Sequence, residues 1–423
     1  MDNGKFLEVS ASDKLNNWDL LISRESKLYS RENDIRTEFG RDYTRILHSL
    51  AYRRLKHKTQ VFFNTQNDHI CTRIEHVNHV ESVSFTIAKY LGLNTELTKA
   101  IATSHDLGHA PFGHHGESCL KELAQKYLNQ DFWHEKHGLY CVDNIELLEN
   151  DKRQFENLGL TYAVRDGIIS HCGELDDNFI VPRKEYMDLS CYNCIGQYQP
   201  YTWEACVVKI ADKIAYLGRD IEDAIRLGFI SIKELRELSR IAKKYNYENL
   251  NTTLIMHELI IDLCNSSSPE HGIELSESNF EMMKDVKNFN NTYIYKSSKF
   301  DKYKEYVKLI IHTNVEFLVS YYSTTLETIT KILTDTDNAL ANTNSKISNI
   351  NLLNEFIAWL INYIDFNHLS SIENIAYKLN NKHKNRKLYN VFDKSDYVQA
   401  VLHFVAGMTD QYAIKAFQSL TSF

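Results

Sequence analysis

Proline and glycine are scarce in this sequence, which holds 4 prolines and 15 glycines among 423 residues. Both residues interrupt regular secondary structure, so a chain with few of them contains few forced breaks. Alternating apolar and polar positions, the pattern of half-buried strands, are also scarce. The sequence therefore predicts an all-α fold built from long helices.

The chain has no excess of basic residues, and its formal net charge is -8. Proteins that wrap nucleic acid non-specifically depend on a net basic footprint, which is missing here. Nothing indicates single-stranded nucleic acid as a partner, although a local basic patch would permit it. A phosphate-bearing ligand would need such a local basic pocket.

Signals for export, membranes and disulfides are absent as well. The start, "MDNGKFLEVSASDKLNNW", has no apolar core of a signal peptide, and no apolar run reaches the length that spans a bilayer. The eight cysteines are scattered, and "CYNC" at Cys191–Cys194 lacks a second pair at zinc-finger spacing. We therefore expect a reduced, cytoplasmic protein with no membrane partner.

Domain organisation follows from length and composition. The length allows two or three domains, but the even, helix-favouring composition favours one. We expect a single unit over residues 1–423, with a catalytic core at about 60–230 and a helical C-terminal extension at about 231–423. The basic segment 30–60 is expected to form helices with a turn near Gly40.

Three later segments predict long helices. The first, "RIEHVNHVESVSFTIAKYLGL", has apolar residues at helical spacing and ends at Gly92. The second, "NTELTKAIATSHDLG", begins at Asn94 or Thr95 and is expected to end with Gly108 in a left-handed conformation, so that the preceding His-Asp pair lies in its last turn. The third runs from about Thr202 to Leu227.

Histidines are concentrated in one part of the chain. Nine of the 18 histidines lie between residues 69 and 137: His69, His76, His79, His105, His109, His114, His115, His134 and His137. A single histidine on an amphipathic helix is usually a packed or surface residue. The stretch "SHDLGHAPFGHHGE", from Ser104 to Glu117, instead combines four histidines with an aspartate and a glutamate. Such a density indicates a functional site.

The pattern favours a metal centre. His105 and Asp106 are neighbours at a helix end, and divalent transition metals accept imidazole nitrogen together with carboxylate oxygen. Two further ligands must come from elsewhere. His76 and Asp212 are the best candidates, because each lies at the polar edge of an otherwise apolar helix. Burying an aspartate among apolar residues is costly unless it is paired or binds a metal.

The ordered set His76, His105-Asp106 and Asp212 resembles the HD superfamily of metal-dependent phosphohydrolases. Five ordered segments are similar to the deoxyguanosine-triphosphate triphosphohydrolase-like family: "RRLKHKTQVF", "TRIEH", "HDLGHAPFGHHGE", "ADKIAY" and "AGMTDQYA". The resemblance implies an HD-domain helical fold with additional C-terminal helices. It also implies hydrolysis of deoxynucleoside triphosphates (dGTP or several dNTPs) at the α-phosphate to a deoxynucleoside and inorganic triphosphate, with manganese, magnesium or another divalent metal.

The resemblance also implies catalytic roles. His114 and Glu117 match the pair that activates the attacking water, and His109 and His134 match phosphate-contacting and acid-base histidines. From the residues alone, His114 and Glu117 equally fit a pair that caps a helix starting near Gly113. His134 equally fits an exposed structural histidine.

Substrate contacts are implied at five positions. Arg73 and Lys213 match phosphate-binding residues, Tyr216 would lie against the sugar and exclude a 2′-hydroxyl, and Asp220 and Gln60 would bind the 3′-hydroxyl. Spacing of four places Asp212, Tyr216 and Asp220 on one helix face. Without the family, the basic residues read as solvated surface charges and Tyr216 as a core residue.

One departure and several alternatives remain. The family's Asp-Tyr pair before "AGMTD" is replaced here by His403 and Phe404. The resemblance implies a homo-oligomer, a hexamer in the family, and leaves a nucleotide activator open. The alternatives are another HD enzyme, acting on a nucleoside monophosphate, cyclic dinucleotide or guanosine alarmone, and a nucleotide sensor without turnover.

Overall fold

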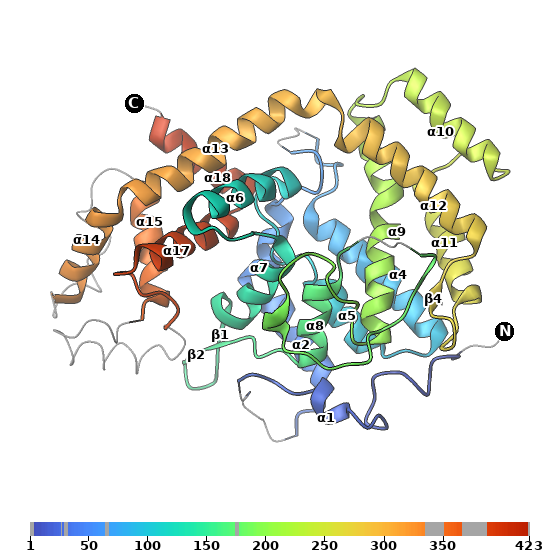
Figure 1. Cartoon of the computed structure of the whole chain (residues 1–423), viewed down its shortest axis with the longest axis horizontal. Coiled ribbons are helices and arrows are strands. Elements are labelled where there is room, and N and C mark those ends of the chain that lie inside the picture. Colours follow the sequence, from blue (N-terminus) through green and yellow to red (C-terminus); the bar gives the residue numbers. More distant parts are fainter. Residues whose placement is uncertain are drawn as a thin grey trace. The chain divides into compact units, whose positions relative to one another are not determined.

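The computed structural model describes residues 4–26, 28, 33–63, 67–173, 177–334, 351–365 and 387–421. Helices dominate these residues (Figure 1). The strands form two small antiparallel ribbons, β1 (Leu147–Glu149) with β2 (Phe155–Asn157), and β3 (Phe179–Ile180) with β4 (Ile273–Glu274). The predicted all-α class is confirmed, because neither ribbon builds a layer of the fold.

The α-helices have the following bounds: α1 (Trp18–Leu21), α2 (Glu38–His48), α3 (Leu50–Arg54), α4 (Arg73–Leu91), α5 (Thr95–Ser104), α6 (Gly113–Leu128), α7 (His134–Tyr140), α8 (Tyr162–Ser170), α9 (Trp203–Arg226), α10 (Ile232–Lys244), α11 (Thr252–Ser266), α12 (Glu277–Asn290), α13 (Asp301–Ser320), α14 (Tyr322–Thr334), α15 (Asn351–Leu360), α17 (Lys394–Ala406) and α18 (Asp410–Thr421). Short 3-10 turns are η1 (Leu55–His57), η3 (Leu189–Cys191), η5 (Ser298–Phe300) and η6 (Ile361–Tyr363). Two π-helical turns are η2 (Cys141–Ile145) and η4 (Asn291–Tyr295).

The chain divides into two compact units whose segments alternate along the sequence. The first unit comprises residues 1–48, 59–107 and 159–304, and the second comprises 49–58, 108–158 and 305–423. A single domain with a core at about 60–230 and an extension at about 231–423 stays a prediction.

The first unit is organised around three helices, α4, α5 and α9, which contact one another. Helices α2 and α8 pack against α5, and α11 and α12 pack against α9 (Figure 1). The end of α4 and the start of α5 are those that the sequence predicts. Gly92 ends α4 with φ 84°, and the Asn94 side chain accepts hydrogen bonds from the backbone N–H groups of Glu96 and Leu97 at the start of α5. The predicted third helix is α9, which Thr202 caps.

Three local predictions are wrong. Gly40 lies inside α2 rather than in a turn. Helix α5 ends at Ser104, so His105 is the residue at its C-terminal boundary and Asp106 follows the helix. Gly108 is not among the described glycines with positive φ. Its requirement is steric, because a Cβ there would lie 2.0 Å from the carbonyl oxygen of His134.

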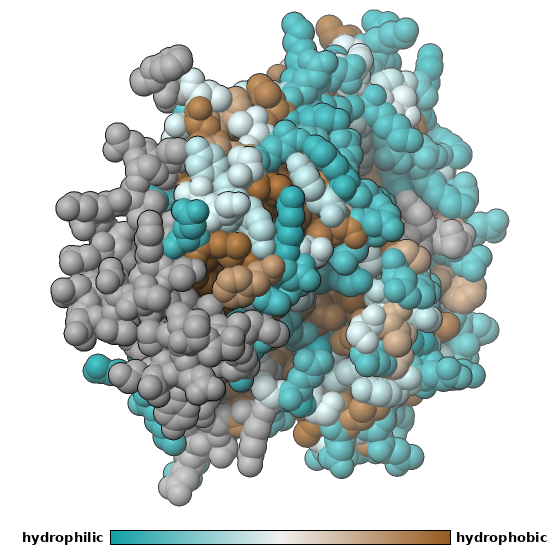
Figure 2. All heavy atoms as spheres, turned by 60° about the vertical axis from the view of Figure 1, so that its left-hand side comes forward, coloured by the Kyte–Doolittle hydropathy of each residue, from teal (hydrophilic) through white to brown (hydrophobic). Residues whose placement is uncertain are grey.

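The second unit packs α6 against α17, and α15 contacts α14, α17 and α18. Figure 2 shows one face of the molecule, where hydrophilic side chains (teal) cover much of the surface and hydrophobic residues (brown) form patches between them. Among the helices that the structure describes, none combines the length and the apolar character needed to cross a membrane.

Candidate metal centre and histidine cluster

The four predicted metal ligands come together in the first unit. His76 lies on α4, His105 and Asp106 follow α5, and Asp212 lies on α9. Oδ1 of Asp212 is 3.0 Å from Nε2 of His76 and 3.8 Å from Nε2 of His105. The Asp106 carboxylate is 3.7 Å from Nε2 of His76 and 3.5 Å from Nε2 of His105.

These spacings fit a bound cation. Donors about 2.0 to 2.1 Å from a four-coordinate metal lie roughly 3.3 Å from one another. Ligand atoms of His76, His105 and Asp212 form one group of the required compactness, and those of His105, Asp106 and His171 form another. The donor set, imidazole plus carboxylate, suits a divalent transition metal.

The orientation of His105 supports a metal rather than a simple ion pair. Nδ1 of this ring is 2.7 Å from the carbonyl oxygen of Ala102. A carbonyl only accepts, so Nδ1 carries the proton and Nε2 presents a lone pair. That Nε2 is buried and has no hydrogen-bond partner among the described residues. A metal would satisfy this buried acceptor.

Electrostatics at the cluster keep Asp212 ionised. Burial opposes its charge, but the hydrogen bond and the charge of His76 outweigh burial and lower the pKa of its carboxyl well below the usual value. Burial likewise opposes charge on His76, and the neighbouring Asp212 and Asp106 reverse this and raise its pKa. An ionised carboxylate is the form that a metal binds.

Arg73 is buried beside this cluster. Its Nη1 donates to Oδ2 of Asp106 at 2.9 Å, and its Nη2 donates to the backbone oxygens of Thr59 and Gln60 at 3.1 and 3.2 Å. Arg73 is 2% exposed, so its reading as a solvated surface charge is wrong. Its Nε has no hydrogen-bond partner among the described residues.

The other predicted substrate contacts also lie in the first unit. Lys213 donates to the carbonyl oxygen of Gly173 at 2.9 Å, so it is not a freely solvated charge. Lys213 and Tyr216 line a small cavity of about 20 Å³, together with Leu217, Phe280, Met283, Lys284 and Lys287. The Gln60 side chain presents a buried Oε1 that finds no hydrogen-bond partner among the residues described.

Asp220 lies one helix turn beyond Tyr216 and is 2% exposed. The Tyr295 hydroxyl donates to Oδ2 of Asp220. Burial raises the pKa of this carboxyl to about 6. Sequence reasoning missed Tyr295, because it lies in the π-helical turn η4 within a polar segment that carries no recognisable motif.

Sequence reasoning also missed His171. Its ring centroid is 4.9 Å from that of His105, and its Nδ1 is 2.8 Å from the carbonyl oxygen of Ile168. His171 directly follows the buried helix α8, just as His105 follows α5. That shared position, a histidine immediately after an apolar helix, was the available signal.

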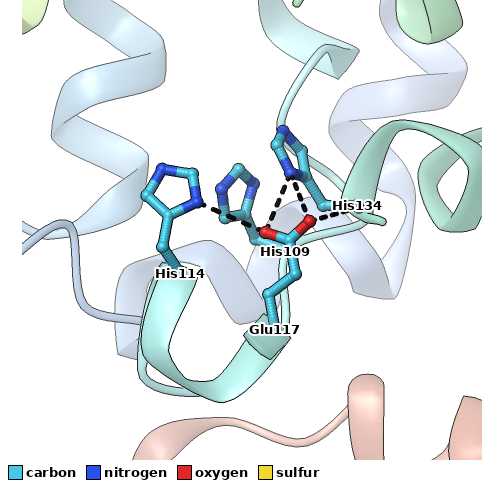
Figure 3. Close-up of side chains that lie close together, drawn as sticks. All are labelled: His109, His114, Glu117 and His134. Carbon is cyan, nitrogen blue, oxygen red and sulfur yellow. Dashed lines mark hydrogen bonds and ion pairs between the residues drawn. The ribbon is translucent and has the colours of Figure 1, made fainter. Parts of the chain in front are cut away.

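The four predicted catalytic residues form a second cluster, in the second unit (Figure 3). His114 lies in the first turn of α6 and Glu117 follows one turn later, His134 begins α7, and His109 lies in the turn before α6. Figure 3 shows the three imidazole rings grouped around the Glu117 carboxylate. The rings of His109 and His134 are 3.7 Å apart between centroids.

Glu117 connects the members of this cluster. Its Oε2 is 3.3 Å from Nδ1 of His114 and 3.1 Å from Nδ1 of His134, and its Oε1 accepts from the backbone N–H of His134 at 3.0 Å. Burial opposes its charge, but the two histidines outweigh burial and hold the pKa of the carboxyl well below its usual value. An ionised glutamate can orient both imidazoles and increase their basicity.

The alternative readings of this cluster are not supported. Helix α6 begins at Gly113 as expected, but its N-terminal boundary residue Phe112 makes no side-chain cap hydrogen bond, and the His114–Glu117 contact joins two side chains. His134 is 4% exposed and is therefore not a surface histidine. The His114 side chain is 74% exposed, which leaves its ring accessible to a ligand.

At the departure from the family pattern, His403 is buried in the second unit. Its Nδ1 is 2.7 Å from the hydroxyl of Tyr389, and its Nε2 is 2.7 Å from Nε2 of Gln399. Burial lowers the pKa of His403 well below its usual value. Its neutral ring is part of the packing at the C-terminal motif.

Known proteins match this chain over most of its length. The HD domain family matches residues 73–217, a range that contains all four predicted metal ligands. A protein of Pelagibacter ubique is 31% identical over 417 residues, which cover 95% of this chain and 98% of the relative. A protein of Caldanaerobacter subterraneus is 36% identical over 293 residues, covering 68% of this chain and 75% of the relative.

A protein of Desulfatibacillum aliphaticivorans is 40% identical over 264 residues, covering 61% of this chain and 67% of the relative. All three relatives carry the name deoxyguanosinetriphosphate triphosphohydrolase-like protein. The likeness therefore extends beyond the HD domain to the whole length of a relative, and this chain belongs to the deoxyguanosinetriphosphate triphosphohydrolase-like family.

Proposed function

We propose that the protein hydrolyses deoxynucleoside triphosphates, dGTP or several dNTPs, at the α-phosphate to a deoxynucleoside and inorganic triphosphate. The observation that carries this proposal is the pair of clusters. One is a His/Asp donor set with a buried Nε2 on His105 that has no hydrogen-bond partner in the described part of the chain, and the other is an accessible His114 hydrogen-bonded to the ionised Glu117. Only two residues separate Asp106 from His109 in the sequence.

His76, His105, Asp106 and Asp212 would hold a divalent metal, manganese, magnesium or another transition metal. A bound metal of this kind polarises a phosphoryl oxygen and lowers the pKa of coordinated water. Arg73, whose Nη1 already contacts Asp106, adds positive charge where phosphate oxygens would bind. Lys213 adds a second positive charge as a flexible ammonium group. Arg73 and Lys213 would thereby supply the local positive charge that a phosphate ligand needs in a protein of negative net charge.

Proton transfer is assigned to the cluster of the second unit. His114 accepts the proton of the attacking water, and Glu117 orients its ring and stabilises the imidazolium that forms. His134 hydrogen-bonds to the same carboxylate and is proposed to donate a proton to the leaving 5′-oxygen. His109 is proposed to contact the phosphates. Hydrolysis at the α-phosphorus then breaks the bond to the 5′-oxygen and releases triphosphate intact.

Selection of deoxyribose is assigned to α9. Tyr216 is proposed to lie against C2′ of the sugar and exclude a 2′-hydroxyl. Asp220 and Gln60 are proposed to hydrogen-bond to the 3′-hydroxyl. A nucleotide without this hydroxyl would leave both buried groups without a partner, so the site would discriminate strongly against it. Oε1 of Gln60 is buried and has no hydrogen-bond partner among the described residues, which supports this role.

The assembly and location are proposed from the same family membership. We propose a cytoplasmic homo-oligomer, a hexamer, with a nucleotide as its activator. Light scattering of the purified protein with and without a mixture of dNTPs would measure the assembly. A monomeric enzyme with full activity would contradict this part of the proposal.

Product analysis tests the proposed reaction. Purified protein with Mn²⁺ or Mg²⁺ is incubated with each dNTP, singly and in mixtures, alongside GTP, and the products are separated by chromatography. Deoxynucleoside plus intact triphosphate is the expected result. Monophosphate plus pyrophosphate would favour another HD enzyme chemistry, and tight binding without any product would favour a nucleotide sensor.

A further inference from the structure

The segments "RRLKHKTQVF" and "AGMTDQYA" take no part in the proton transfer proposed for the second unit. One residue of each segment nevertheless contacts the turn that contains His109. This turn, residues 109–113, runs from His109 to the start of α6. It determines where His109 lies and how α6 presents His114 and Glu117.

The turn has an unfavourable backbone conformation. Phe112 has φ 64° and ψ 22°, and Gly113 follows with φ 57°. Glycine adopts this left-handed region freely, but a residue with a side chain is strained there. The Phe112 side chain is also 2% exposed, so its ring cannot move without disturbing the packing around it. Such a conformation persists only where surrounding contacts fix it.

Asp410 supplies one such contact. Its Oδ1 accepts a hydrogen bond from the backbone N–H of Phe112 at 2.9 Å, although 298 residues separate the two in the sequence. Asp410 is 6% exposed and is the first residue of α18, where the helix dipole favours a carboxylate. A charged acceptor makes a stronger hydrogen bond to a backbone N–H than a neutral one.

Lys58 supplies the second contact, at the other end of the turn. Its buried Nζ donates to the carbonyl oxygen of His109 and, at 3.2 Å, to that of Ala406, the last residue of α17. A cation is favoured at a helix C-terminus. The corner between α17 and α18 is therefore joined to both ends of the turn, through Lys58 at His109 and through Asp410 at Phe112.

We propose that Asp410 and Lys58 are positioning residues, which fix the 109–113 turn and so place His109 at the phosphates and align His114 and Glu117 for proton transfer. This inference rests on the proposed function of those three residues. It assigns the C-terminal motif to catalysis without any contact to the substrate. Displacing a catalytic group by about 1 Å can lower a rate about 100-fold, so loss of either contact lowers kcat more than it raises KM.

The test compares Asp410→Ala and Asp410→Asn with Asp396→Ala. Asparagine retains an oxygen that accepts from the Phe112 N–H, whereas alanine does not. Asp396 provides a matched control, because its carboxylate accepts from the backbone N–H of Asn390 at 3.0 Å in the same unit. We expect Asp410→Ala to lower kcat about 10- to 100-fold. Asp410→Asn should remain within about fivefold of the wild type, and Asp396→Ala should leave kcat unchanged.

A double-mutant cycle separates positioning from a general loss of structure. If Asp410 acts through His114 and its neighbours, Asp410→Ala lowers kcat by a smaller factor in a His114→Ala background than in the wild type. An equal factor in the two backgrounds, or an equal loss in Asp396→Ala, would overturn the proposal. Lys58→Met should reproduce the Asp410→Ala phenotype.

Amide hydrogen exchange gives a readout that does not depend on activity. The peptide spanning residues 109–117 should exchange faster in Asp410→Ala than in the wild type or Asp396→Ala. If the wild type releases no triphosphate, the proposed function fails, but the exchange experiment still tests the role of Asp410. Unchanged exchange in Asp410→Ala would overturn the positioning role itself.

Discussion

The two clusters use similar residue types for arrangements that suit different chemistry. The cluster of the first unit has two carboxylates, and its donor atoms lie 3.0 to 3.8 Å apart around a buried Nε2 of His105 that has no hydrogen-bond partner among the described residues. The cluster of the second unit has one carboxylate in the centre, Glu117, hydrogen-bonded to two imidazoles, and one of these, His114, is largely exposed.

We interpret this difference as one between ligand geometry and acid-base geometry, since spacing alone would allow either cluster to hold a metal ion. Metal ligands must present lone pairs to a common point, and extra negative charge stabilises the cation there. A water-activating histidine needs access to the reactant and one carboxylate that orients it. Counting histidines in the sequence does not distinguish the two, because the distinction lies in which atoms meet and which remain accessible.

The largest effect is expected at the metal centre. Asp212→Ala should lower metal affinity by more than about 100-fold, because even residues outside the ligand shell change it 10- to 100-fold. Turnover should fall with metal content, which plasma mass spectrometry would measure. Asp223→Asn is the matched control on α9, since Asp223 accepts from the backbone N–H of Cys71 instead. Full metal content and activity in Asp212→Ala would disprove the ligand assignment.

Substitutions in the cluster of the second unit should lower kcat without loss of metal. His114→Ala and Glu117→Gln are each expected to lower kcat about 100- to 10,000-fold, the usual contribution of a positioned acid or base. Metal content should match the wild type in both variants. His115→Ala, a change of the adjacent residue on α6, should keep normal turnover. If either catalytic variant lost its metal, the distinction between the two clusters would be wrong.

One buried group in each unit should make stability depend on pH, in opposite directions. The first is Asp220 in the first unit. Burial raises its pKa to about 6 from an ordinary value of 3.8. Above pH 6 the buried charge therefore lowers stability by up to about 3 kcal/mol. Asp220→Asn should be more stable than the wild type at pH 7.5, and this gain should disappear as the pH falls from 6 to 4.

Chemical denaturation across that pH range would measure the effect. The same variant should raise KM for dNTPs, because a neutral amide oxygen accepts a weaker hydrogen bond from the 3′-hydroxyl than a carboxylate does. A variant that gains no stability at pH 7.5 would show that Asp220 is not destabilising when ionised.

A smaller effect of opposite sign is expected at His137 in the second unit. Burial lowers its pKa to about 4, and its Nδ1 is 2.9 Å from the carbonyl oxygen of Gly108. The unfolded chain binds a proton at this residue near pH 6.5, whereas the folded chain does not until about pH 4. Stability should fall by about 2 kcal/mol between pH 6.5 and pH 5 through this residue.

His137→Gln keeps a donor for Gly108 but does not titrate. Its melting temperature should therefore depend less on pH than that of the wild type over this range. Equal slopes for the two proteins would contradict the buried, neutral state of His137.

Local signals predicted the elements that position the metal centre. Gly92, Asn94 and Thr202 mark ends of α4, α5 and α9 through backbone conformation and side-chain caps, which short sequence patterns encode. His76, His105, Asp106 and Asp212 are predicted as ligands from their types and from their positions on or directly after these helices. Among the residues that sequence reasoning missed, His171 has a local signal in its position after α8, whereas Tyr295 has none.

Tyr295 meets Asp220 across 75 residues, and Asp410 meets Phe112 across 298. Gly108 was misread because its requirement comes from the carbonyl oxygen of His134, a neighbour in space, and not from its own dihedral angles. Long-range contacts of this kind depend on the packing of helices, which a single sequence does not specify residue by residue.

The central claim, metal-dependent attack of water at the α-phosphorus, is tested most directly by hydrolysis in water enriched in ¹⁸O. Mass spectrometry of the products of a dNTP, with Mn²⁺ or Mg²⁺ present, would locate the label. The account predicts one ¹⁸O atom in the released triphosphate and none in the deoxynucleoside. Label in the deoxynucleoside, or in a monophosphate or pyrophosphate product, would contradict it.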